Sequence, residues 1–316
     1  MNDLSVMLRP QLNRKPPPVY QRILVYHGVD RKGEKKLNGR FISQKELELH
    51  FRWLAEHCFV ASLEEYCQGR FAKDRPTVLI TFDDGYLNNL ELMLPVAQKY
   101  NLPVTVFVTT LYRTGQSLQW ADLIDLTAFL DGQDIDLQGQ IFKLNRKRQY
   151  RSTSTGQELK AFCKRSETSV IQALYETLSK RTTFQTDAQW DVYWKQLSPK
   201  GLQQLGMSPL VTIGNHGDTH AILNKIPIEE ASQELKVSKI YLENLLQQPI
   251  TAIAYPNGNY SPMLIQAARQ LGYHHQFGAD IVSSTVEQKW GIYPRLTINP
   301  YISWYNQRLA FADGGY

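Results

Sequence analysis

Two adjacent carboxylates stand at the end of an apolar segment in the first third of the chain. Asp83 and Asp84 follow the β-branched and apolar run 77–82 and precede Gly85. In parallel α/β proteins, functional sites are built at the carboxyl ends of buried strands. Two neighbouring carboxylates beside an apolar core stay ionised only with a cation or another partner. The pair therefore predicts a cation site, although a turn with a helix N-cap explains the same residues.

Two histidines provide groups that complement this pair. His216 and His220 follow another short apolar run, 211–215. On a helical turn, residues i and i+4 share one face, so both imidazoles can reach one metal ion. Two histidines and one carboxylate leave coordination positions open for water and substrate, as in hydrolytic metal centres. We expect Zn²⁺, although imidazole also suits Co²⁺, Ni²⁺ and Fe²⁺.

Three short motifs together resemble the polysaccharide deacetylases (NodB homology, carbohydrate esterase family 4). They are Thr-Phe-Asp-Asp-Gly at 81–85, His-Gly-Asp-Thr-His at 216–220 and Ala-Tyr-Pro-Asn-Gly at 254–258. The opening segment Ile-Leu-Val-Tyr-His-Gly-Val at 23–29 is similar to the first strand of a circularly permuted branch. That branch includes the biofilm poly-N-acetylglucosamine deacetylases. The resemblance covers roughly residues 22–110 and 198–300.

The resemblance implies metal-assisted hydrolysis of an N-acetyl group on an amino sugar. Asp84, His216 and His220 would hold the metal, and Asp83 would accept the proton of the attacking water as general base. His27, protonated, would replace the late catalytic histidine of the other branch and donate to the leaving amine.

Four further residues are candidates for contact with the substrate. Tyr26 and Tyr255 belong to the resembling motifs, and the backbone N–H of Asn257 would stabilise the developing oxyanion. Trp120 follows a strand that should end at the active face. It is therefore our candidate for an aromatic side chain that stacks on a sugar.

Two positions depart from the family pattern. Ala254 stands where the third motif usually carries an arginine that orients the base. Arg295, on another expected strand, is the candidate to supply this guanidinium to the site. Gly217 replaces the usual serine or threonine, which removes one hydrogen bond around the first metal histidine. Neither departure removes a metal ligand, so we expect an active enzyme.

Other functions stay open at this point. Amidases acting on cyclic ureides and imides share the fold expected here. A catalytically inactive carbohydrate-binding relative would typically have lost the first aspartate, which is present as Asp83. The sequence does not determine whether the sugar belongs to a polysaccharide, a glycolipid or a nucleotide-linked precursor.

Alternating strand and helix signals indicate how these residues are positioned. Strand-like runs at 22–26, 77–82 and 103–109 alternate with helical patterns, the first opened by a Ser-x-x-Glu capping box at 43–46. This alternation predicts an α/β fold with parallel strands, a distorted or incomplete (β/α)7 barrel. We expect an N-terminal arm over 1–21 and a single deacetylase-like domain over 22–316.

The alternation is interrupted between about 112 and 197, where we expect a largely helical insertion. A small hairpin is indicated around Gly139, and helices near 157–180 and 187–197. Residues 143–165 hold eight Lys or Arg and one acid. Two interpretations stay open: a subdomain that grips an anionic or lipid-linked substrate, or a solvated face over an aromatic core.

Composition limits the remaining possibilities. A hydrophobic fraction of 42% and a charged fraction of 21% are typical of a globular chain, and the net charge of +5 is too small to indicate nucleic-acid binding. The three cysteines show no metal spacing. Residues 1–21 contain no secretory apolar region, and no apolar run is long enough to span a bilayer, so we expect a cytoplasmic location. Peripheral membrane contact stays open, and oligomeric state is not readable.

Overall fold

A parallel sheet forms the centre of the molecule. The structure, a computed structural model, describes residues 19–115, 118–179, 181, 188–279 and 290–313. Nine strands form one sheet in the order β13-β12-β11-β10-β6-β5-β1-β14, with β4 paired to β5. All of its pairings are parallel. The strands are β1 Gln21–Tyr26, β4 Phe59–Ala61, β5 Thr77–Phe82, β6 Val104–Val108, β10 Val211–Asn215, β11 Ala252–Ala254, β12 His275–Phe277, β13 Ile292–Tyr293 and β14 Leu296–Thr297.

The sheet curls into an incomplete barrel, as the sequence predicts. Strand β5 pairs with β1 along its whole length and with β6 at its carboxyl end. All six residues of β5 are buried. Leu79 belongs to an apolar cluster that also contains Phe107 and Phe277, whereas Ile80 and Phe82 belong to the larger cluster formed with the helices. Alternate side chains of β5 therefore fill two different apolar layers.

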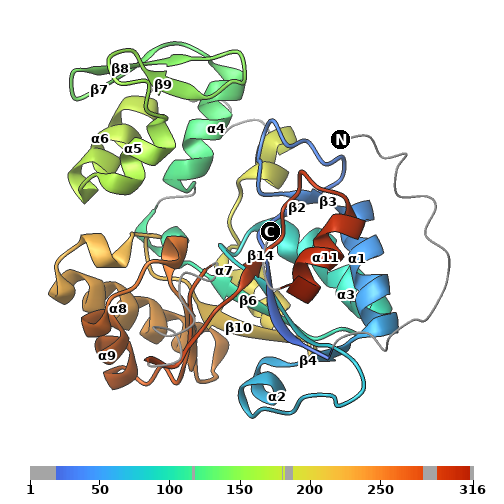
Figure 1. Ribbon diagram of the computed structural model, residues 1–316. Helices are drawn as coiled ribbons and strands as arrows, with labels where there is room; N and C mark the ends of the chain where they lie inside the picture. The colour runs from blue at the N-terminus through green and yellow to red at the C-terminus, as the bar shows by residue number, and fades with distance from the viewer. Residues whose placement is uncertain (1–18, 116–117, 180, 182–187, 280–289, 314–316) are drawn as a thin grey trace, which may run out of the picture.

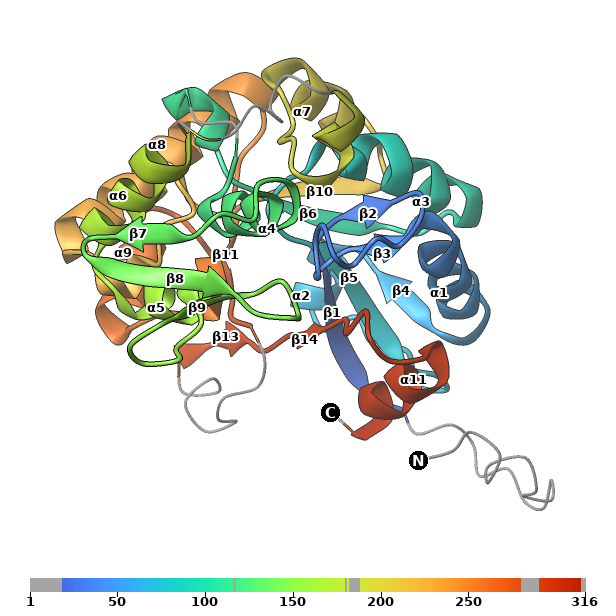
Figure 2. The same ribbon diagram turned by 90° about the horizontal axis from the view of Figure 1, so that it is seen from above.

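Helices cover the outside of the strands (Figure 2). The first of them, α1 (Gln44–His57), begins at Ser43 with the predicted capping box, in which Glu46 completes the reciprocal bonds. The others that pack around the barrel are α2 Leu63–Cys67, α3 Leu94–Tyr100, α7 Pro199–Gly206, α8 Ile228–Leu246, α9 Pro262–Gln270 and α11 Trp304–Asp313. His50 of α1 is buried, and its ring stacks on Trp304 at 3.9 Å.

The segment between β6 and β10 forms a lobe of its own (Figure 1). It contains α4 Trp120–Leu130, β7 Ile135–Leu137, β8 Gln140–Leu144, β9 Tyr150–Ser152, α5 Leu159–Arg165 and α6 Thr168–Ser179, followed by the 3₁₀ turn η5 Ala188–Tyr193. The expected hairpin around Gly139 is present, and β9 extends it to a three-stranded antiparallel sheet. The apolar cluster of this lobe also includes Leu37, Phe41 and Tyr86, which anchor it to the barrel.

Two expectations concern the ends of the chain and the membrane. The arm expected over 1–21 falls mostly on residues 1–18, which lie outside the described residues. Among the helices that the structure describes, none combines the length and the apolar character needed to cross a bilayer.

Candidate metal centre and catalytic pocket

The aspartate pair occupies a tight turn at the end of β5. Asp83 is 5% exposed and Asp84 1%. Asp84 and Gly85 both adopt positive φ, at 77° and 75°, so the chain turns sharply after the strand. A Cβ atom on Gly85 would lie 3.0 Å from the side chain of Val108, so this close approach requires glycine. Aspartate tolerates the left-handed conformation better than most residues, which explains its place before that glycine.

The two histidines lie on a loop after β10, not on the helical turn that their spacing suggested. Residues 216–222 are non-helical, and Gly217 and His220 adopt positive φ. The carboxylate of Glu234, from α8, fixes the loop by accepting the backbone N–H groups of Asp218 at 3.0 Å and Thr219 at 2.9 Å. The rings of His216 and His220 still meet, with their centroids 5.0 Å apart.

Asp84 and the two histidines converge on one point. The Asp84 Oδ1 atom lies 3.2 Å from His220 Nε2 and 3.5 Å from His216 Nε2. The His216 Nδ1 atom lies 2.7 Å from the carbonyl oxygen of Ala254. Since a carbonyl only accepts hydrogen bonds, Nδ1 carries the proton and Nε2 presents its lone pair to the centre. One ligand atom from each of the three residues lies within 4.8 Å of the others.

This cluster fits a divalent metal ion. Asp84 Oδ1 is buried and has no hydrogen-bond donor within the part of the chain that the structure describes. Burial opposes ionisation of Asp84, but the charge of Arg40 and the neighbouring His220 and His27 together outweigh burial and hold its pKa well below the usual value. A buried carboxylate oxygen with two imidazole nitrogens around it is a donor set that Zn²⁺ prefers.

Arg40 belongs to the site but is not among the residues predicted from the sequence. Its guanidinium donates to Asp84 Oδ2 at 3.0 Å and to the Tyr86 hydroxyl at 2.7 Å, and it also contacts Asp122. Asp122 lies on α4 and is buried. The lobe therefore contributes a carboxylate to the network behind Asp84. No local pattern distinguishes Arg40 from its basic neighbours in sequence.

Asp83 has a different partner, the guanidinium of Arg295. Both nitrogen-to-oxygen distances of this bidentate pair are 2.8 Å. Arg295 lies at the entrance to β14, is 2% exposed, and also donates to the Gly278 carbonyl at 2.6 Å. Burial opposes ionisation of Asp83, but the charge and hydrogen bonds of Arg295, together with His216 and His27, overcome burial, so the pKa is lowered. A guanidinium from another strand thus reaches the first aspartate, although Ala254 holds the usual position.

One cavity of about 250 Å³ brings most of the expected residues together. Its lining includes His27, Asp83, Asp84, Trp120, His216, His220, Asn257 and Arg295. Lys160 and Lys164 of α5 also line it, so the basic stretch of the lobe reaches the pocket. Burial lowers the pKa of His27 to about 4, so its imidazole is neutral at neutral pH. The expected acid role therefore needs a proton that His27 receives during the reaction.

The two tyrosines expected to touch substrate lie elsewhere. Tyr26 is 2% exposed in the core, where its hydroxyl lies 3.3 Å from His50 Nδ1. Tyr255 is fully buried and donates to Gln276 at 2.6 Å. Because successive side chains of a strand point to opposite faces, Val25 lines the pocket and Tyr26 packs behind the sheet.

Comparisons with known proteins identify relatives of this chain and of its fold. The chain is 21% identical over 308 residues to YxkH of Bacillus subtilis (strain 168), whose name describes a polysaccharide deacetylase, covering 96% of this chain and 78% of YxkH. The deacetylase PplD of Streptococcus pyogenes has a similar fold, with a TM-score of 0.58, 18% identity and coverage of 92% of this chain and 98% of PplD. IcaB of Ammonifex degensii gives a TM-score of 0.54, 16% identity and coverage of 93% and 99%. The family profile for polysaccharide deacetylase matches residues 71–128 and 159–275, so the chain belongs to the polysaccharide deacetylase family.

Proposed function

We propose that this protein is a metal-dependent hydrolase that removes the N-acetyl group from an amino-sugar unit of a carbohydrate. One observation carries the proposal: the Asp84, His216 and His220 cluster and the Asp83–Arg295 pair line the same cavity. The three residues of the cluster would hold the ion, for which we propose Zn²⁺. When bound, such an ion polarises a carbonyl oxygen and lowers the pKa of water.

The chain itself supplies the groups that move protons. Asp83 would accept the proton of the attacking water, and its pairing with Arg295 keeps it ionised and fixes its direction. His27, neutral at first, would receive the proton released by the attacking water and then deliver it to the leaving amine. The backbone N–H of Asn257, at the cavity lining, would stabilise charge on the acetyl oxygen. Trp120 would pack against the sugar ring.

The proposal is tested by acetate release from N-acetylated sugars, supplied free, as oligosaccharides and as nucleotide-linked sugars. We expect release that stops when a chelator is added and returns with Zn²⁺. A cyclic ureide and an imide belong in the same panel, because turnover of these alone would identify an amidase. Metal-loaded protein that releases nothing from any substrate would contradict an enzymatic function.

A variant of Asp83 separates the base from the metal ligands. Asp83→Asn should lower kcat by at least about a hundredfold, within the range typical of a lost general base, while metal content stays near that of the wild type. The matched control is Asp74→Asn, since Asp74 is exposed and outside the cavity. Undiminished activity in Asp83→Asn would show that the base assignment is wrong.

A further inference from the structure

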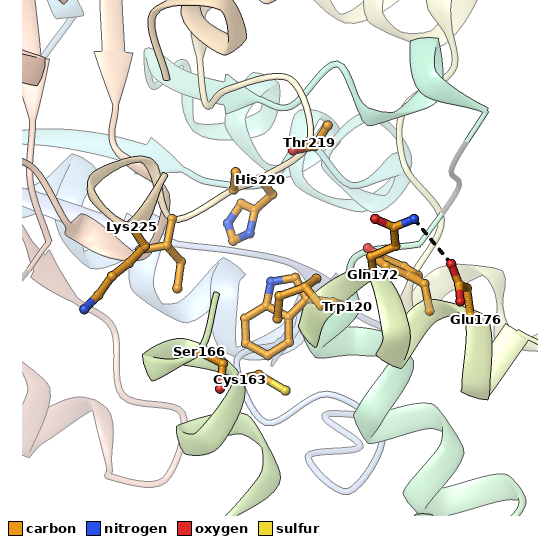
Figure 3. A pocket seen from close by; sticks show the side chains of 12 residues that line it. Trp120, Cys163, Ser166, Gln172, Glu176, Thr219, His220 and Lys225 are labelled. Atoms are coloured by element: carbon orange, nitrogen blue, oxygen red, sulfur yellow. Dashed lines mark hydrogen bonds between the residues drawn. The ribbon is translucent and has the colours of Figure 1, made fainter. Parts of the chain in front are cut away.

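A second cavity lies beside the catalytic one. It has a volume of about 430 Å³ and shares Trp120, His220 and Ile222 with the catalytic cavity. Its other walls come from α5 and α6 of the lobe and from the segment that ends at Lys225 in the 3₁₀ turn η6 (Leu223–Lys225). In the view of Figure 3, the indole of Trp120 lies between His220 of the barrel and Cys163 of α5.

Five apolar side chains line the interior of this second cavity. Trp120 and Cys163 are almost fully buried, and Ile171, Ala221 and Ile222 are partly buried. The charged groups that line it, Glu176 and Lys225, are exposed to solvent. The interior therefore offers apolar contact to a ligand, and among the residues that the structure describes, charge is confined to exposed side chains.

Four polar side chains in the walls are already engaged within the protein, whereas His220 Nδ1 has no hydrogen-bond partner among the described residues. Each of four donates to another protein group: Ser166 to the Phe162 carbonyl, Tyr175 to the Leu118 carbonyl, Thr219 to Glu234 and Gln172 to Glu176. A sugar ring in this cavity would bury hydroxyl groups with few donors left to meet them, at about 1–3 kcal/mol for each unsatisfied group. An alkyl chain needs no such partners and gains from leaving water.

We propose that the second cavity binds an apolar chain carried by the sugar substrate, so that the enzyme acts on an amphiphilic N-acylated amino sugar. This inference rests on the proposed function, because it names the substrate class of that site. The chain can belong to the aglycone, or to the acyl group on nitrogen, which then takes the place of acetyl as the group that is hydrolysed. Both sources share the same chemistry, since either attachment places the sugar at the catalytic residues and the chain beside Trp120.

Calorimetric binding to chelator-treated protein tests the proposal without requiring turnover. The probes are the methyl and octyl β-glycosides of N-acetylglucosamine and the methyl glycoside of N-octanoylglucosamine, all below their micelle concentrations. Each buried methylene strengthens binding by about fourfold. We therefore expect at least one octyl probe to bind ten times more tightly than the methyl N-acetyl probe, and the tighter one identifies where the chain is attached.

Variants locate the effect in the second cavity. Ile171→Asn places a polar group in the wall, and Gln172→Trp fills the cavity from an exposed position that tolerates a larger side chain. Both should reduce the octyl-to-methyl affinity ratio toward one. Ile141→Asn is the matched control, since Ile141 is an exposed isoleucine of β8 outside both cavities, and it should keep the wild-type ratio.

Three results would overturn the inference. Equal affinities of the octyl and methyl probes for the wild type would show that the cavity takes no chain. An octyl preference that survives in both cavity variants would place the chain elsewhere. The third result concerns the methyl glycoside of N,N′-diacetylchitobiose. If this probe binds more tightly than the methyl glycoside of N-acetylglucosamine, and Ile171→Asn removes the difference, the cavity binds a second sugar ring. The binding measurements need no turnover, so they can be interpreted even if no acetate is released. The two proposals can therefore fail separately.

Discussion

Replacing Arg295 with Met should destabilise the protein strongly, because it leaves the Asp83 carboxylate buried without its partner. The guanidinium and the carboxylate meet at 2.8 Å through both oxygens, and the two residues are 2% and 5% exposed. Removing one member of such a buried pair costs about 3–5 kcal/mol in the free energy of unfolding. Urea unfolding with chelator present measures this cost without a contribution from bound metal.

The double variant Asp83→Asn with Arg295→Met distinguishes a charge effect from lost packing. It leaves no unpaired charge, although the Gly278 carbonyl still loses its donor, at about 1–3 kcal/mol. We therefore expect the double variant to be about 2 kcal/mol more stable than Arg295→Met alone. Arg70→Met, at an exposed position, is the control and should change little. If the unfolding free energy of the double variant falls by the sum of the two single-variant losses, the ion-pair argument is refuted.

Three further outcomes follow from other parts of the structure. By elemental analysis, His216→Gln should reduce bound zinc from about one per chain to near zero. The control Lys200→Gln should keep the wild-type zinc content. A full zinc content in His216→Gln would exclude His216 as a ligand. Gly214→Ala places a Cβ 2.4 Å from the ring of Phe107, so the unfolding free energy should fall by about 1–3 kcal/mol, and an unchanged value would show that the ring yields freely. Burial lowers the pKa of His50 from 6.5 to about 3, so the unfolded chain binds more protons between these values and stability falls as pH drops from 6.5 toward 3. With chelator present, the unfolding free energy of His50→Phe should fall by about 2–3 kcal/mol less than that of the wild type between pH 7 and 4.5. Identical pH profiles of the two proteins would show that His50 does not cause the loss of stability.

Much of the candidate site follows from local pattern. The sequence shows a carboxylate pair after one buried strand and two histidines after another. Their proximity can be predicted because parallel strands bring their carboxyl ends together. The convergence of Asp84, His216 and His220 was expected on this ground, even though the helical turn assumed for the histidines is a loop. The ends of the strands determine where these side chains lie. The three residues therefore meet as predicted, although the predicted local conformation of the histidines was wrong.

Partners that are distant in the sequence were harder to predict. Arg295 reaches Asp83 from 212 residues away, and it was considered only because the third motif lacks its usual arginine. Arg40 gave no signal, because an arginine in a basic loop looks the same whether it faces solvent or a buried carboxylate. Tyr26 was misplaced by its motif, since one step along a strand moves a side chain to the opposite face.

The sequence alone predicted the alternation of strands and helices, the residue types of the candidate metal cluster and the family, because these depend on residue types and short spacings. Only the tertiary structure decided which cations neutralise the aspartates and that Trp120 separates two cavities. Those features depend on where distant segments meet. Contacts between such segments arise from packing of the whole chain, which no window of neighbouring residues contains.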